Sequence, residues 1–175
     1  LAVVYTDNQG RHYVHRTEYI RAAESDNQDE ATQQCKIVAR IAGALLLPSI
    51  TIEINGLGRF LPNMLRKHLS KMGIASAVVE LSSRRPKALR IIEAFDAVMA
   101  AKALYVHQSV IKTPFIREMQ EWMPEKTGAS DDGLDAVAGA LASEPVRIRT
   151  IGGVGTRPNW QGTSSMHLAD SQFEV

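Results

Sequence analysis

The sequence predicts an α/β domain in which helices flank a mixed β-sheet. Runs of β-branched residues alternate along the chain with segments whose apolar residues recur at helical spacing, which is typical of this fold class. The first two predicted strands are joined by a short turn and should pair antiparallel, whereas later strands are separated by helices and should pair in parallel. The chain has 175 residues, 45% of them hydrophobic, and is long enough to bury a core.

Local signals justify the elements one by one. The Asp-Asn-Gln-Gly stretch at 7–10 has turn composition and joins two β-prone runs, which predicts a hairpin. Pro48 should end the first helix and Gly73 the second, and Pro86 suits a first helical turn. The predicted elements are strands over 1–6 and 12–20, a helix over 31–47, a strand over 49–54, a helix over 60–72, a strand over 75–81, a helix over 86–99, a strand over 103–107, and helices over 113–122 and 134–141.

The periodic pattern ends near residue 145. We assign residues 1–145 to the domain and residues 146–175 to a C-terminal tail that is either flexible or docks on a partner. A complete sheet would need one more strand, which we expect before Leu1. The 20 basic and 19 acidic residues exclude a histone-like protein, and the single cysteine excludes a disulfide scaffold or a Cys-rich zinc module. The longest apolar run is far shorter than the ~20 residues of a membrane span.

Glu53 is the one charged residue in an otherwise apolar, β-branched strand. A carboxylate on a buried strand is costly unless it is paired, protonated or bound to a metal. Alternatively, Glu53 lies on a solvated face, because half-exposed strands alternate buried and exposed positions. The strand by itself leaves both interpretations open.

Three aspartates occur within five residues at the predicted start of the last helix, in the order Asp131, Asp132 and Asp135. One acid is enough to cap a helix, with Ser130 or Asp131 as the capping residue, so three indicate that a positive group offsets them. Their spacing can place all three near one side of the helix. Together with Glu53 they suit divalent metal ions, and two such ions can activate water in phosphodiester hydrolysis.

A basic group lies on the predicted loop and helix that precede these acids. It consists of Arg84, Arg85, Lys87 and Arg90. Such residues can contact the phosphates of DNA beside an acidic site without reading sequence. The alternative is an ordinary solvated loop, and the sequence does not decide between the two.

Three segments together resemble one protein family. Residues 53–58 read Glu-Ile-Asn-Gly-Leu-Gly, with Asn55 and Gly56 as further motif residues; residues 87–91 read Lys-Ala-Leu-Arg-Ile; and residues 131–136 read Asp-Asp-Gly-Leu-Asp-Ala. In this order they resemble the nuclease domain of the large terminase subunit of tailed bacteriophages. The resemblance implies an RNase H-like fold and a metal-dependent endonuclease that cuts concatemeric double-stranded DNA into genome lengths during packaging.

The resemblance also assigns roles to the acids. Glu53, Asp131 and Asp132 would be catalytic and would bind two Mg²⁺ or Mn²⁺ ions. Asp135 would be a further ligand or a residue that holds the start of the helix. The family carries its first acid on the first strand, and no residue of this chain matches it, so we expect that acid on the strand before Leu1.

The resemblance covers roughly residues 1–143 and implies partners. These are double-stranded DNA, the portal protein, the small terminase subunit and a packaging ATPase domain upstream in the same polypeptide, acting at the procapsid portal in the host cytoplasm and not at a membrane. The chain has no Gly-x-x-x-x-Gly-Lys-Ser/Thr loop, so we expect no ATPase within it. Two alternatives stay open: another RNase H-like nuclease, such as a junction resolvase or transposase core, and a non-catalytic assembly module of the packaging motor.

Overall fold

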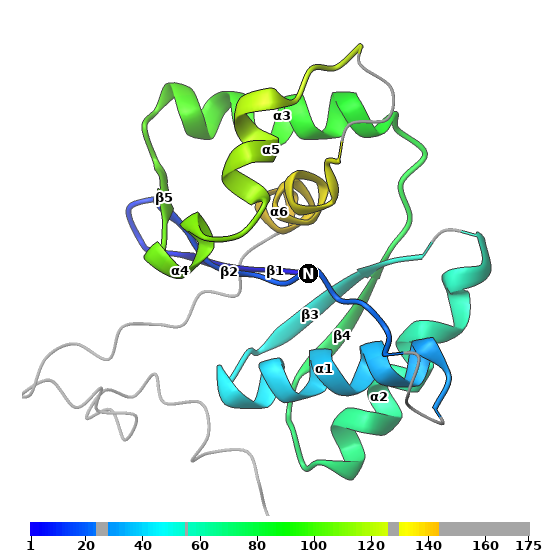
Figure 1. The fold of residues 1–175 in the computed structure, drawn as a ribbon. Helices are drawn as coiled ribbons and strands as arrows, with labels where there is room; N and C mark the ends of the chain where they lie inside the picture. Colours follow the sequence, from blue (N-terminus) through cyan, green and yellow to red (C-terminus); the bar gives the residue numbers. More distant parts are fainter. Residues whose placement is uncertain (24–27, 55, 126–129, 144–175) are drawn as a thin grey trace, which may run out of the picture.

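The structure confirms the predicted order of strands and helices (Figure 1). It is a computed structural model that describes residues 1–23, 28–54, 56–125 and 130–143. The sequence pattern did not predict the short helices η1 and α4, because one turn is too short to show a period. The elements are β1 (Ala2–Thr6), β2 (His12–Thr17), α1 (Glu30–Ala44), β3 (Ser49–Glu53), the 3₁₀ helix η1 (Gly56–Phe60), α2 (Leu61–Lys71), β4 (Ala77–Leu81), α3 (Lys87–Ala100), β5 (Leu104–Val106), α4 (Gln108–Ile111), α5 (Phe115–Glu121) and α6 (Asp132–Ala142).

The described strands form two separate sheets. β1 pairs antiparallel with β2, and β2 pairs in parallel with β5, so this three-stranded sheet is mixed, as predicted. β3 and β4 form a second, two-stranded parallel sheet. In Figure 1, α3, α5 and α6 lie above the strands, and α1 and α2 lie below them. The α/β class and the mixed sheet flanked by helices are therefore confirmed, although the described strands do not join into one continuous sheet.

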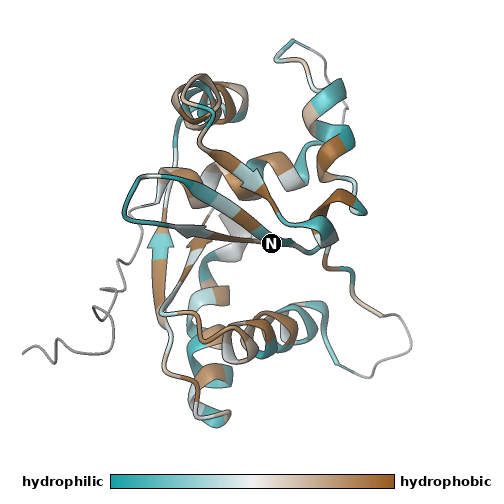
Figure 2. Cartoon of the chain, turned by 90° about the vertical axis from the view of Figure 1, so that its left-hand side faces the viewer, coloured by the Kyte–Doolittle hydropathy of each residue, from teal (hydrophilic) through white to brown (hydrophobic). Residues whose placement is uncertain are grey.

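Two apolar clusters hold these elements together. The first contains Val14 of β2, Phe115 of α5 and Val137 of α6, all fully buried. The second joins α1, α2 and β3, and it contains the buried Cys35. Figure 2 shows hydrophobic and hydrophilic residues mixed along the helices, which is the pattern of helices with one buried face.

The predicted turn and helix stop both form. In the hairpin, the Asp7 carboxylate accepts hydrogen bonds from the backbone N–H groups of Gln9 and Arg11, and Gly10 adopts a φ of +78°. Gly73 follows α2 with a φ of +66°. Glycine is favoured at both positions because other residues rarely adopt this left-handed conformation.

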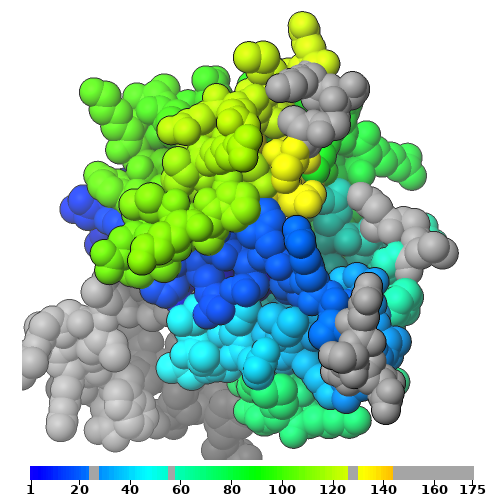
Figure 3. Space-filling view, in the orientation of Figure 1, coloured from blue at the N-terminus to red at the C-terminus, as the bar shows by residue number. Residues whose placement is uncertain are grey.

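A cavity of about 560 Å³ separates the two sheets. β1 and β3 line it, α1 contributes Val38 and Ile41, and α6 contributes Ala136, Gly139 and Ala140. In Figure 3 the N-terminal residues lie between an upper half, formed by the green and yellow segments, and a lower half that contains α1. In the part of the chain that the structure describes, β1 and β3 are not paired with each other, so each is an edge strand of its sheet.

Two further points concern the limits of the domain. Of the helices that the structure describes, none combines the length and the apolar character needed to cross a membrane. The predicted tail, residues 146–175, lies outside the described residues.

Candidate functional site

Glu53 is the last residue of β3, and its side chain is paired. Its Oε2 accepts a hydrogen bond from Nη1 of Arg90 at 2.8 Å, and the side chain is 30% exposed. The two interpretations left open by the sequence are both partly right, because the carboxylate is half-exposed and is also neutralised by a cation. The carboxyl end of a parallel strand is where ligands commonly bind in α/β sheets.

The three aspartates lie at the start of α6. Asp131 is the N-cap residue, Asp132 is the first residue of the helix, and Asp135 follows one turn later. The small residues of this helix allow it to pack against β1 and α3. This packing brings the N-terminus of α6 to the same end of the molecule as Glu53.

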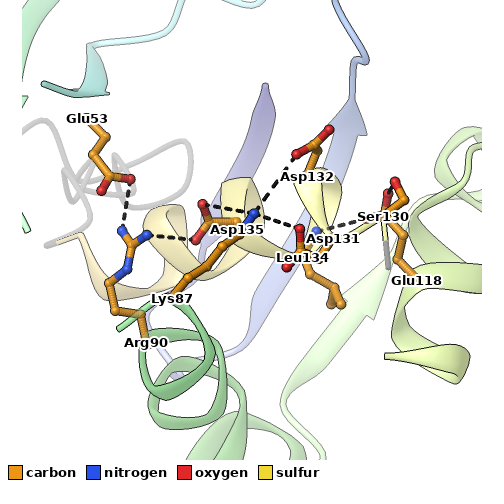
Figure 4. A network of polar contacts seen from close by, with 9 residues as sticks. All are labelled: Glu53, Lys87, Arg90, Glu118, Ser130, Asp131, Asp132, Leu134 and Asp135. Atoms are coloured by element: carbon orange, nitrogen blue, oxygen red, sulfur yellow. Dashed lines mark hydrogen bonds and ion pairs between the residues drawn. The ribbon is translucent and has the colours of Figure 1, made fainter. Parts of the chain in front are cut away.

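The first turn of α3 supplies the positive charges. Lys87 Nζ donates to Asp131 Oδ1 at 2.7 Å and lies 3.8 Å from Asp135 Oδ2. Arg90 bridges two elements, because its Nη1 binds Glu53 and its Nη2 lies 3.2 Å from Asp135 Oδ1 (Figure 4). Residues three apart on a helix share one side, so α3 presents both cations to the acids.

These ion pairs form one network, which contains the carboxylates of Glu53, Asp131, Asp132 and Asp135 and the cations of Lys87 and Arg90. The network has more negative than positive charge. Burial raises the pKa of Asp135 above its usual value, although the positive charges of Lys87 and Arg90 oppose the shift. Burial lowers the pKa of Lys87, but the hydrogen bond to Asp131 and the nearby carboxylates outweigh it and leave that pKa raised. The hydrogen bond to Glu53 is the main cause that raises the pKa of Arg90. Both cations therefore stay charged at neutral pH.

Asp132 lies at the edge of the network. Its side chain is 82% exposed, and its contact with Lys87 is long, at 4.0 Å. In Figure 4 the Asp132 carboxylate is well separated from Glu53, whereas Asp135 lies between them. All three aspartates lie within 4.0 Å of Lys87 Nζ, which agrees with the spacing prediction, but Asp132 makes the longest contact and is the most exposed of the three.

The other predicted residues are distributed differently. Arg84 and Arg85 are exposed, and Arg85 pairs with Glu93 at 2.7 Å rather than with the acids. Gly56 begins η1, directly beyond the β3 end of the site. Asn55 lies outside the described residues. The predicted basic group is thus divided: Lys87 and Arg90 belong to the site, and the two preceding arginines lie on the surface.

The chemistry of the acids suits a hard divalent cation, but their arrangement is incomplete for one. Among the described residues, no three His, Cys, Asp or Glu side chains converge on a point where a metal ion could bind. Lys87 and Arg90 lie between the carboxylates and form ion pairs with them. As arranged, the described residues do not form a metal site by themselves.

Glu118 of α5 is a residue of the site that the sequence analysis missed. It is 4% exposed, and its Oε2 accepts from the backbone N–H of Leu134 at 3.1 Å. Its Oε1 accepts from the hydroxyl of Ser130, also at 3.1 Å. We predicted that Ser130 or Asp131 would cap α6, but the Asp131 side chain makes no capping bond. No local signal identifies Glu118, because it lies 16 residues before the amide that it caps.

A second cavity, of about 870 Å³, opens beside these residues. Glu53, Ser130 and Asp132 line it, together with Leu61 of α2 and Tyr19 beyond β2. The site is therefore accessible from a hollow between the two halves of the domain. A comparison with protein-family models and with curated proteins finds no match for this chain.

The Arg90 bridge should contribute measurably to stability. Replacing Arg90 with methionine removes a cation from two partly buried carboxylates, those of Glu53 and Asp135. We expect the free energy of unfolding, measured with urea, to fall by about 2 kcal/mol, less than for a fully buried pair because all three groups are partly solvated. Arg85→Met is the matched control, since its exposed pair with Glu93 should contribute less than about 0.5 kcal/mol. Equal losses for the two variants would contradict this account.

Proposed function

We propose that this chain is the nuclease domain of a terminase large subunit, an RNase H-like endonuclease that hydrolyses phosphodiester bonds of double-stranded DNA. The observation that carries the proposal is the meeting of Glu53, from the end of β3, with Asp135 and Asp131, from the start of α6, around Lys87 and Arg90. Glu53 and the two aspartates come from segments far apart in the sequence, and Glu53 also lines an open cavity.

The two cations suit an anionic substrate. Lys87 and Arg90 can exchange a carboxylate for a phosphate, because both form charge-assisted hydrogen bonds with either group. Phosphate contact would turn these side chains toward the DNA and release the carboxylates. The released carboxylates would then be available to hold divalent ions, whose contribution would be to activate water and stabilise a leaving oxygen.

The cavity between β1 and β3 supports the same proposal. A strand that precedes Leu1 and joins β1 by a hairpin would run antiparallel to β1 within this cavity. It would hydrogen-bond to both edge strands and join the two sheets. Its last residues would lie near Leu1, which lines the same cavity as Glu53 and Asp132. Such a strand could bring the first acid of the family to the site.

The test is plasmid cleavage in Mg²⁺ or Mn²⁺ by a polypeptide extended upstream by one strand. We expect cleavage of the duplex with little sequence preference, and a loss of about 100-fold or more in the Asp132→Ala and Glu53→Ala variants, because removal of one group that acts in the reaction costs this much. Asp96→Ala is the matched control, because Asp96 is an exposed aspartate of α3 outside the network. A folded, extended polypeptide that leaves DNA intact would contradict the proposal.

One observation favours a second candidate, a non-catalytic assembly module. Lys87 and Arg90 already form ion pairs with the acids, as in a purely structural network. The cleavage test separates the two functions. Preferential cutting of branched DNA, or strand transfer, would instead indicate a junction resolvase or a transposase core.

The proposed function also implies partners and a location. The partners would be double-stranded DNA, the portal protein, the small terminase subunit and an ATPase domain upstream in the same polypeptide. The domain would act in the host cytoplasm, at the procapsid portal.

A further inference from the structure

Helices α1 and α6 both have an aspartate at the N-cap position, and they are capped in different ways. At α1, the N-cap residue Asp29 has φ −61° and ψ 153°, and its side chain accepts from the backbone N–H of Thr32. At α6, the N-cap residue Asp131 has φ −144° and ψ 18°, and its side chain makes no such bond. An aspartate at the N-cap position normally caps its helix with its own side chain. Because Asp131 does not, another group must bind the backbone N–H groups at the start of α6.

Glu118, a residue of α5, caps α6 instead. Its carboxylate spans the start of α6, with one oxygen on the Ser130 hydroxyl and the other on the Leu134 amide. Leu134 is the third residue of α6, and its amide is one that an N-cap aspartate would otherwise bind. The Glu118 carboxylate thus binds hydrogen-bond donors at the start of α6.

The close fit of α6 against Glu118 depends on Gly133. A Cβ atom at this position would lie 2.6 Å from Glu118 Oε2 and 2.1 Å from the hydroxyl oxygen of Tyr19. Burial, followed by the interaction with Glu118, raises the pKa of the Tyr19 hydroxyl, so this group stays neutral beside the carboxylate. The capping arrangement is thus enclosed by its neighbours and fixed in position.

Because Glu118 caps α6, the Asp131 side chain is not needed for capping and lies in the site. Its Oδ1 accepts from Lys87 at 2.7 Å, and this contact is the shortest that Lys87 makes in the network. We propose that Glu118 is a positioning residue that caps α6 in place of Asp131 and thereby keeps the Asp131 carboxylate in the site, facing Lys87. The expected effect of Glu118 on catalysis rests on the proposed nuclease function.

The first measurement does not depend on that function. Acetylation of Lys87 by a small amine-reactive ester, followed by mass spectrometry, reports whether Asp131 still engages this lysine. In Glu118→Ala, the Asp131 side chain should turn to the vacant amides, and Lys87 should react several-fold faster. The exposed Lys71, at the end of α2, is the internal control and should react at an unchanged rate. Glu118→Gln keeps an acceptor for the Leu134 amide and should restore the slow rate.

The second measurement is cleavage by the extended polypeptide. Removing a group that orients a functional side chain typically costs about 10–100-fold, so Glu118→Ala should lose that much in kcat with little change in KM for DNA. Glu118→Gln should remain within a few-fold of the parent. If Glu118→Ala does not fold, Ser130→Ala removes one of the two hydrogen bonds that hold the Glu118 carboxylate and should show the same effects in smaller degree.

The outcomes separate the two claims. Unchanged Lys87 acetylation in folded Glu118→Ala and Ser130→Ala would overturn the positioning role, whether or not the parent cuts DNA. Faster acetylation together with a parent that cleaves no DNA would support the capping exchange and contradict the nuclease. Faster acetylation with unchanged kcat would overturn the catalytic consequence of the inference.

Discussion

Gly133→Ala is expected to destabilise the domain by about 3 kcal/mol, at the upper end of the cost of overpacking a core. The new Cβ would lie 2.1 Å from the Tyr19 hydroxyl oxygen and 2.6 Å from Glu118 Oε2, so both side chains, or α6 itself, must move. Displacing Glu118 also breaks its bond to the Leu134 amide, which leaves a buried donor without an acceptor. Urea unfolding followed by circular dichroism measures the loss.

Gly139→Ala is the matched control on the same helix. A Cβ at Gly139 would meet nothing within 4 Å, so this substitution should stabilise α6 by up to about 1 kcal/mol through helix propensity. Adding Tyr19→Phe to Gly133→Ala should recover part of the loss, because it removes the nearest atom of the clash. If both glycine variants unfold at the urea concentration of the parent, the proposed packing at Gly133 is wrong.

Phe115→Ala is expected to have the largest effect on stability, about 3–5 kcal/mol. Phe115 is fully buried, and its cluster includes Val14 of β2 and Val137 of α6. The substitution would leave a cavity at the point where α5, α6 and the mixed sheet meet. Because net stability is commonly about 5–15 kcal/mol, this single change can unfold much of the protein at room temperature. The measurement is the midpoint of thermal and urea unfolding.

Ile111→Ala provides the comparison for Phe115→Ala. Ile111 is 59% exposed at the end of α4, so its replacement should change stability by no more than about 0.5 kcal/mol. Because α5 also carries Glu118, Phe115→Ala should in addition weaken the capping of α6 and speed acetylation of Lys87. A loss below about 1 kcal/mol would contradict the burial of Phe115 in the core.

The elements of this fold follow from local sequence signals. The Asp-Asn-Gln-Gly turn, Gly73 after α2 and the helical spacing around Cys35 all identify structure within a few residues of themselves. Such signals can be read from sequence because turns, caps and amphipathic faces are determined by neighbouring residues. The candidate acids were also visible, since Glu53 stands out in an apolar strand and three aspartates gather at the start of α6.

The composition of the site was thus predicted in part, but its geometry was not. Sequence alone determined the strands and helices, the hairpin, and the set of acids and bases from which a site could be built. Only the tertiary structure decided that Arg90 joins Glu53 to Asp135, that Asp132 faces solvent, and that Glu118 caps α6. The physical reason is distance along the chain: the Arg90–Glu53 and Lys87–Asp131 contacts join residues 37 and 44 positions apart. Such pairs form only where the packing of α3, α6 and β3 brings their ends together, and no local periodicity records that packing.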